Sequence, residues 1–215
     1  MRPSALLDLV FPPRCGGCGR AGTPWCVSCA ASIRPAHTTR LGDVPLVAAA
    51  CLQGPFQQAI HAYKYRPRPV LSAELAAPLV VAVKDAGLPL RALTFVPLHP
   101  GRARERGFNQ AERLARELGV ALGLPVVPGL ARTRPTAAQV GLTGPEREAN
   151  VAGAFRWAGA EPAPLAAGLV DDVCTTGATL QAAAEGLISA GGSVAAFLVL
   201  AVAHTSAAPL VTLPE

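Results

Sequence analysis

The stretch that decides the predicted fold is Leu-Val-Asp-Asp-Val-Cys-Thr-Thr-Gly-Ala-Thr-Leu, residues 169–180. An apolar strand over 167–173 runs into it, and an alanine-rich helix over 179–190 follows it and ends at two glycines. A second apolar strand covers 193–202. Apolar strands on either side of one helix are typical of a βαβ unit in a parallel sheet whose two faces are both covered.

The rest of the chain continues this alternation of strands and helices. Apolar runs predict strands over 44–52, 92–98 and 125–130, and helical spacing predicts helices over 55–65, 71–85 and 109–122. The sequence therefore predicts an α/β fold, a parallel sheet flanked by helices.

Composition supports an ordered chain. Of its 215 residues 51% are hydrophobic and 15% are charged, which allows a real core and excludes global disorder. The net charge of +5 favours anionic ligands without choosing between phosphates, nucleic acid and a membrane surface.

The longest apolar run, 194–203, is too short to span a bilayer, and the N-terminus does not resemble a signal peptide. We therefore expect a cytoplasmic protein with no membrane insertion.

Residues 175–179 have the features of a phosphate-binding loop. The loop opens into a helix N-terminus at the carboxyl end of a strand, where backbone N–H groups are free to bind an anion. Gly177 permits a close backbone approach, Ala178 belongs to the same loop, and three hydroxyls add donors: Thr175, Thr176 and Thr179.

Asp171 and Asp172 precede this loop and would repel a phosphate that they faced. They fit a ligand that offers them hydroxyl donors or Mg²⁺ instead, and a ribose 5-phosphate offers the hydroxyls. The alternative is a tight turn in which Asp and Thr side chains cap the helix. The glycine-rich signatures of nucleotide hydrolases and dinucleotide-binding proteins are absent from the sequence.

Four cysteines stand in two C-x-x-C pairs: Cys15, Cys18, Cys26 and Cys29. This spacing predicts tetrahedral coordination of a structural Zn²⁺, which would stabilise a segment too short for its own core. A redox pair and unliganded thiols are the alternatives. We therefore expect a small zinc-ribbon-like domain over 1–36 and a second domain over 37–215. Cys51 and Cys174 are expected to be small buried apolar residues.

Two basic, polar stretches lie in the middle of the chain. The first follows the predicted strand at 92–98 and contains Arg102, Arg104 and Arg106, which could neutralise a pyrophosphate. The second, over 133–153, has the length and polarity of a segment that closes over a ligand. A solvated basic surface explains either stretch equally well.

The chain resembles the ComF family, the competence-protein relatives with a type I phosphoribosyltransferase fold. The resemblance rests on the cysteine pairs and the Asp-Asp to Thr-Gly-Ala-Thr loop, together with these strings: Tyr63-Lys64-Tyr65, Val96-Pro97-Leu98-His99, Arg106-Gly107-Phe108-Asn109-Gln110 and residues 147–155. It implies that the 171–179 loop binds phosphoribosyl pyrophosphate (PRPP) with Mg²⁺. It also implies that Lys64, Arg104 and Arg106 contact the pyrophosphate.

Two classes of function follow from this resemblance. The first is a phosphoribosyltransferase that acts on an unidentified nitrogen acceptor, with His99 as the one candidate base. The second is a non-catalytic factor in DNA uptake that binds PRPP, a nucleotide or single-stranded DNA and has a helicase-like partner. For single-stranded DNA, the nearby aromatic platforms would be Tyr63, Tyr65 and Phe108. A zinc-stabilised scaffold for partner proteins is a third interpretation.

Overall fold

The computed structural model describes residues 12–65, 69–98, 100–133 and 151–203. The main sheet has five strands in the order β1-β2-β7-β6-β3, and all neighbours are parallel except β1 and β2. These strands are β1 (Thr39–Leu41), β2 (Val44–Cys51), β3 (Ala92–Phe95), β6 (Ala167–Cys174) and β7 (Val194–Val202). The helices are α2 (Val27–Ala31), α3 (Gly54–Tyr65), α4 (Pro69–Ala86), α5 (Pro100–Arg106), α6 (Gln110–Leu122) and α8 (Ala178–Ile188).

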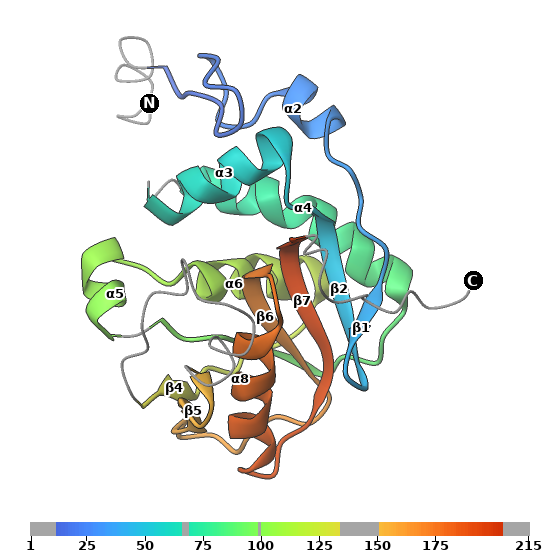
Figure 1. Cartoon of the computed structure of the whole chain (residues 1–215), viewed down its shortest axis with the longest axis vertical. Coiled ribbons are helices and arrows are strands. Elements are labelled where there is room, and N and C mark those ends of the chain that lie inside the picture. Colours follow the sequence, from blue (N-terminus) through green and yellow to red (C-terminus); the bar gives the residue numbers. More distant parts are fainter. Residues whose placement is uncertain (1–11, 66–68, 99, 134–150, 204–215) are drawn as a thin grey trace.

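Both faces of this sheet are covered, which explains why its middle strand, β7, is apolar throughout (Figure 1). Along β7, Phe197 and Val199 pack into the apolar cluster that contains α8. The alternate residues Leu198 and Leu200 pack into the cluster formed with α3, α4 and α6. A mostly parallel sheet between two helical layers confirms the predicted α/β fold. Within the described residues, no helix combines the length and the apolarity needed to cross a membrane.

The N-terminal cysteine segment packs against the α/β fold through α3. The ring of Trp25 meets the ring of Phe56 edge-on, with centroids 6.2 Å apart. Cys15, Cys26 and Cys29 belong to the same apolar cluster as α3 and α4. The cysteine segment therefore shares a core with the helices beside it, and the expected boundary near residue 36 stays a prediction.

The strand predicted over 125–130 is wrong. Val126 makes only one isolated parallel bridge, to Leu93, and Pro128 has no N–H with which to extend the pairing. The next strand is β4 (Leu130–Arg132), which pairs antiparallel with β5 (Phe155–Trp157) as a separate two-stranded sheet.

Candidate functional site

Asp171 and Asp172 lie at the carboxyl end of the central strand β6, beyond the end of its neighbour β3. Pairing between β3 and β6 ends at Phe95 and Val170. Pairing between β6 and β7 continues to Cys174 and Val202. Within the described residues, one side of β6 therefore has no strand partner from Asp171 onward, and this is the position where parallel α/β sheets bind ligands.

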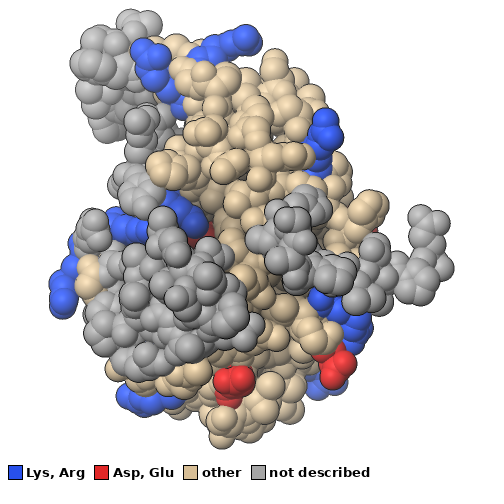
Figure 2. All heavy atoms as spheres, viewed as in Figure 1, with Lys and Arg blue, Asp and Glu red and all other residues tan. Residues whose placement is uncertain are grey.

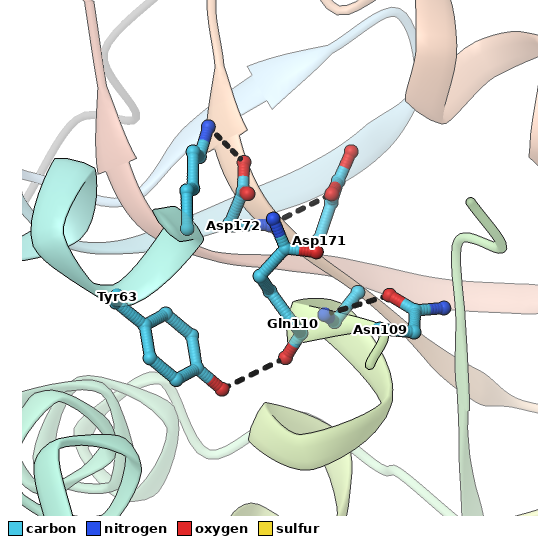
Figure 3. Close-up of polar contacts among 7 residues, drawn as sticks. Tyr63, Asn109, Gln110, Asp171 and Asp172 are labelled. Atoms are coloured by element: carbon cyan, nitrogen blue, oxygen red, sulfur yellow. Dashed lines mark hydrogen bonds and ion pairs between the residues drawn. The ribbon is translucent and has the colours of Figure 1, made fainter. Parts of the chain in front are cut away.

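The two carboxylates occupy different environments (Figure 3). Asp172 forms an ion pair with Lys64 of α3, with Nζ and Oδ1 2.9 Å apart, and these side chains are 15% and 25% exposed. Asp171 accepts a hydrogen bond of 2.8 Å from the N–H of Asp172. Burial, and then the charge of Asp172, raise the pKa of Asp171 to about 7, although the Asp172 N–H, Lys64 and Arg132 oppose that rise. The site therefore holds one ion-paired carboxylate beside one that resists ionisation.

The predicted phosphate loop lies directly beyond these carboxylates. A pocket is lined by Asp171 and by residues 173–180, and α8 begins inside it at Ala178. The hydroxyl of Thr176 accepts a hydrogen bond of 3.4 Å from the Ala178 N–H. Thr175 and Thr179 are partly buried in the pocket lining.

Gly177 is required for a reason that its sequence context did not reveal. Its φ of 85° lies in the left-handed region. A Cβ atom at this position would lie 2.4 Å from the side chain of Leu41, which reaches the loop from β1. The missing side chain therefore makes room for Leu41 and permits the turn that starts α8.

The cations expected near the pyrophosphate come from two helices. Lys64 lies in the last turn of α3 and already contacts Asp172. Arg104 and Arg106 lie in the last turn of α5, where Arg104 is exposed and Arg106 is half-buried. Figure 2 shows basic side chains bordering a recess that has an acidic side chain at its floor.

Several predicted features lie outside the described residues. They are His99, most of the polar segment at 133–153, and the side chains of Tyr65 and Arg102.

Tyr63 and Phe108, which were expected as platforms for stacking bases, are already in contact with other groups. Tyr63 is fully buried, and its hydroxyl donates a hydrogen bond of 3.1 Å to the carbonyl oxygen of Gln110. Its ring lies 5.9 Å from the ring of Phe108. The guanidinium of Arg113 lies 4.3 Å from the centre of the Phe108 ring. The expectation of a free stacking face is therefore wrong for Tyr63, whereas Phe108 is half-buried and has Arg113 over its ring.

Asn109 and Gln110 belong to the sequence strings that the chain shares with the ComF family, but the sequence alone indicated no role for either residue. Asn109 caps α6: its side chain accepts a hydrogen bond from Ala111 and donates one to the carbonyl oxygen of Val96. Gln110 is 1% exposed, and neither polar atom of its side chain has a hydrogen-bond partner among the described residues. The polarity of a residue that the helical pattern buries was the signal for this position.

The four paired cysteines converge on one point. Their sulfur atoms all lie within 4.8 Å of one another, and those of Cys18 and Cys26 are 3.7 Å apart. A tetrahedral Zn²⁺ with bonds of about 2.3 Å separates its sulfur ligands by roughly 3.8 Å. The cluster is therefore consistent with a structural zinc, which the four thiolates would hold. Outside it, Cys174 is buried as expected and Cys51 is partly exposed.

The thiol groups of this cluster differ in how readily they ionise. Burial opposes ionisation of Cys15, but N–H groups of Cys18, Cys26 and Gly17 lower its pKa to about 6. Burial and the neighbouring thiols raise the pKa of Cys29 well above its usual value. Binding of a cation would favour the thiolate form of all four.

The chain is similar in sequence to proteins described as competence protein F and DNA utilization protein, although no family model matches it. It is 35% identical over 137 residues to competence protein F of Haemophilus influenzae, and this alignment covers 59% of each protein. It is 33% identical over 154 residues to the DNA utilization protein YhgH of Salmonella typhi, covering 69% of this chain and 67% of that protein. YhgH of Escherichia coli K12 is 32% identical over 157 residues, with the same coverage. The matched part thus spans only about three fifths to two thirds of these relatives. Together with the α/β fold and the cysteine cluster, this similarity shows that the chain belongs to the ComF family.

Proposed function

We propose that this protein binds PRPP together with Mg²⁺ at the carboxyl end of β6. The observation that supports this most strongly is the placement of two adjacent carboxylates, Asp171 and Asp172, in front of a loop that opens into α8. A phosphorylated ribose has an anionic end for the loop and hydroxyl donors for the carboxylates.

Each part of this ligand has a counterpart among the described residues. The 5-phosphate accepts hydrogen bonds from the N–H groups and hydroxyls of residues 175–179, and the ribose hydroxyls donate to Asp171 and Asp172. The pyrophosphate lies toward the cations Lys64, Arg104 and Arg106. When bound together with the ligand, Mg²⁺ would neutralise charge on the ligand's oxygens, so these residues would not need to supply a dedicated metal cage.

As an enzyme, the protein would transfer the phosphoribosyl group to a nitrogen acceptor. The bond from the anomeric carbon to the pyrophosphate oxygen breaks, a carbon–nitrogen bond forms, and pyrophosphate leaves with the bonding electrons. The sugar becomes cation-like in the transition state, so carboxylates beside the ribose stabilise it. The acceptor loses its proton to a base outside the described residues or to water.

A second candidate is a binding factor in DNA uptake that recognises PRPP, a nucleotide or single-stranded DNA and works with a helicase-like partner. The names of its relatives, competence protein F and DNA utilization protein, support this role. Exposed arginines at 14, 20 and 34 give the cysteine segment a basic surface suited to phosphates. The covered rings of Tyr63 and Phe108 count against base stacking at that place. Either role would be exercised in the cytoplasm, with zinc holding the N-terminal domain.

Calorimetry with PRPP and Mg²⁺ tests the site. The double variant Asp171→Asn with Asp172→Asn should weaken binding at least tenfold. The matched control is Asp43→Asn with Asp85→Asn, which removes two charges from exposed positions and should leave the affinity unchanged. Equal affinity in both double variants would rule out the site.

A second experiment separates the two roles. Purified protein with PRPP and Mg²⁺ is offered a panel of purine and pyrimidine bases and amines, and pyrophosphate release is measured. Release with at least one acceptor supports a transferase, whereas bound PRPP with no release across the panel supports the binding factor.

A further inference from the structure

Gln110 presents a buried amide without a hydrogen-bond partner in the part of the chain that the structure describes. It is the first residue of α6 and is 1% exposed, and neither Oε1 nor Nε2 makes a hydrogen bond. Nearly all buried polar groups in proteins are paired, and an unpaired one carries its full desolvation cost. A methionine would fill a similar volume without that cost, so the amide calls for an explanation.

The position of this amide is firmly set. Asn109 caps the helix and also bonds to the end of β3 through the Val96 carbonyl. The backbone carbonyl of Gln110 accepts the hydroxyl of the buried Tyr63. Figure 3 shows the Gln110 side chain directed from the start of α6 toward Asp171 and Asp172 on β6. Its unpaired atoms therefore face the two carboxylates from inside the fold.

Asp172 loses its ion pair if a ligand binds the ammonium group of Lys64. In this structure Lys64 forms an ion pair with the Asp172 carboxylate. A pyrophosphate binds lysine through the same ammonium group, and its higher charge competes strongly for that group. Once Lys64 turns to the ligand, Asp172 is left beside Asp171 with one cationic partner fewer, and an unpaired carboxylate there is costly.

We propose that Gln110 is a positioning residue that supplies a replacement donor: when the ligand draws Lys64 away, the Gln110 Nε2 donates a hydrogen bond to the Asp171–Asp172 pair. The inference rests on the proposed function, because it needs a ligand that competes for Lys64. The amide then stays unpaired in the free protein and gains a partner on binding. The cost of burying it without a hydrogen bond therefore destabilises only the free state, and this favours the complex.

The test compares Gln110→Met with Gln110→Glu. Methionine removes both polar atoms at similar volume, and glutamate keeps the shape but replaces the donor with a further acceptor. We expect Gln110→Met to weaken binding of PRPP with Mg²⁺ about tenfold, without lowering the thermal midpoint of the free protein. Gln110→Glu should weaken binding at least as much. Gln57→Met, at an exposed position of α3, is the control and should change neither property.

Each contrary result overturns the inference. PRPP affinity of Gln110→Met within twofold of the wild type would show that the amide plays no part in binding. Wild-type affinity in Gln110→Glu would rule out donation. A marked loss of stability in both variants would show that the amide is already paired in the free protein.

A double-mutant cycle with Asp172→Asn, followed by urea unfolding, needs no ligand. If Gln110 faces Asp171 and Asp172, Gln110→Met should change the equilibrium constant of unfolding by different factors in the two backgrounds. The factor in the wild-type background and the factor in the Asp172→Asn background should differ at least twofold. Additive effects would overturn the inference. If the wild type fails to bind PRPP but the two substitutions are not additive in the cycle, the proposed function fails. The placement of Gln110 beside Asp171 and Asp172 then still stands.

Discussion

The ammonium group of Lys64 lies 2.9 Å from a carboxylate oxygen of Asp172, and thereby links the last turn of α3 to the end of β6. The two side chains are 25% and 15% exposed, so the pair is partly shielded from water and from salt. In the free protein Lys64 acts as the counter-ion of the carboxylates to which we assign the ribose.

Replacing Lys64 with methionine should destabilise the protein by about 1–3 kcal/mol, because Asp172 keeps its charge without its partner. Urea unfolding at pH 7 measures the change. Arg116→Met is the matched control, since Arg116 and Glu112 form an exposed pair along α6 at 64% and 36% exposure. That variant should lose no more than about 0.5 kcal/mol. Equal losses in the two variants would mean that shielding of the Lys64 pair contributes nothing.

Asp171 should make stability fall as pH rises. Its pKa is raised from 3.8 in the unfolded chain to about 7 in the folded protein, first by burial and then by Asp172. Between these values the folded protein binds more protons than the unfolded chain, so stability declines from about pH 4 to about pH 7. Asp171→Asn should therefore match the wild type near pH 4 and exceed it by about 1–3 kcal/mol at pH 8. Urea unfolding at both pH values checks this, and a difference that stays constant with pH would contradict it.

Loss of one ligand should abolish zinc binding at the cysteine cluster. We expect the wild type to contain one zinc ion per chain and Cys29→Ser to lose it, together with at least about 3 kcal/mol of stability. Metal analysis and thermal unfolding measure both effects. Cys51→Ser lies outside the cluster and should keep the metal. Full zinc content in Cys29→Ser would argue against four-sulfur coordination.

Gly177 and Gly191 form a matched pair for testing the loop. Both have positive φ, at 85° and 83°. A Cβ at Gly191 would meet nothing within 4 Å, whereas one at Gly177 would collide with Leu41. Gly191→Ala should cost about 1 kcal/mol from backbone strain alone, and Gly177→Ala about 2–4 kcal/mol, because Leu41 must also move. Only Gly177→Ala should weaken PRPP binding, and equal effects on binding would contradict the role assigned to the loop.

The elements that the sequence predicted well are those whose pattern is local. The strand β7 and the first half of β6 are apolar runs, α6 ends at Gly123, and α8 ends shortly before Gly191, so the chain itself holds a signal for each of these elements. The short pair β4 and β5 was not predicted, because three residues hold no periodicity and their pairing joins distant segments. The helix α5 was interpreted only as a basic stretch, although Pro100 suits a first helical position.

The candidate site divides in the same way. Asp171, Asp172 and residues 175–179 lie within one short stretch of the chain, so the sequence alone could predict a phosphate loop beside two carboxylates. The ion pair of Lys64 with Asp172 depends on where α3 packs, and the contact of Leu41 with Gly177 depends on the turn between β1 and β2. The helical pattern of α6 could have placed Gln110 on the buried face, but the lack of a partner for its amide among the described residues is a property of the assembled core.

The helix α3 carries Phe56, which packs on Trp25, near its start and Lys64 near its end. An α-helix turns by about 100° per residue, so inserting or deleting one residue between these positions would swing Lys64 to another side of the helix. A substitution at either end leaves the rotational offset between the two positions unchanged, whereas such a change of length does not. We therefore expect natural variants of this protein to tolerate insertions and deletions in the connections around α3 while the spacing between these two residues stays constant.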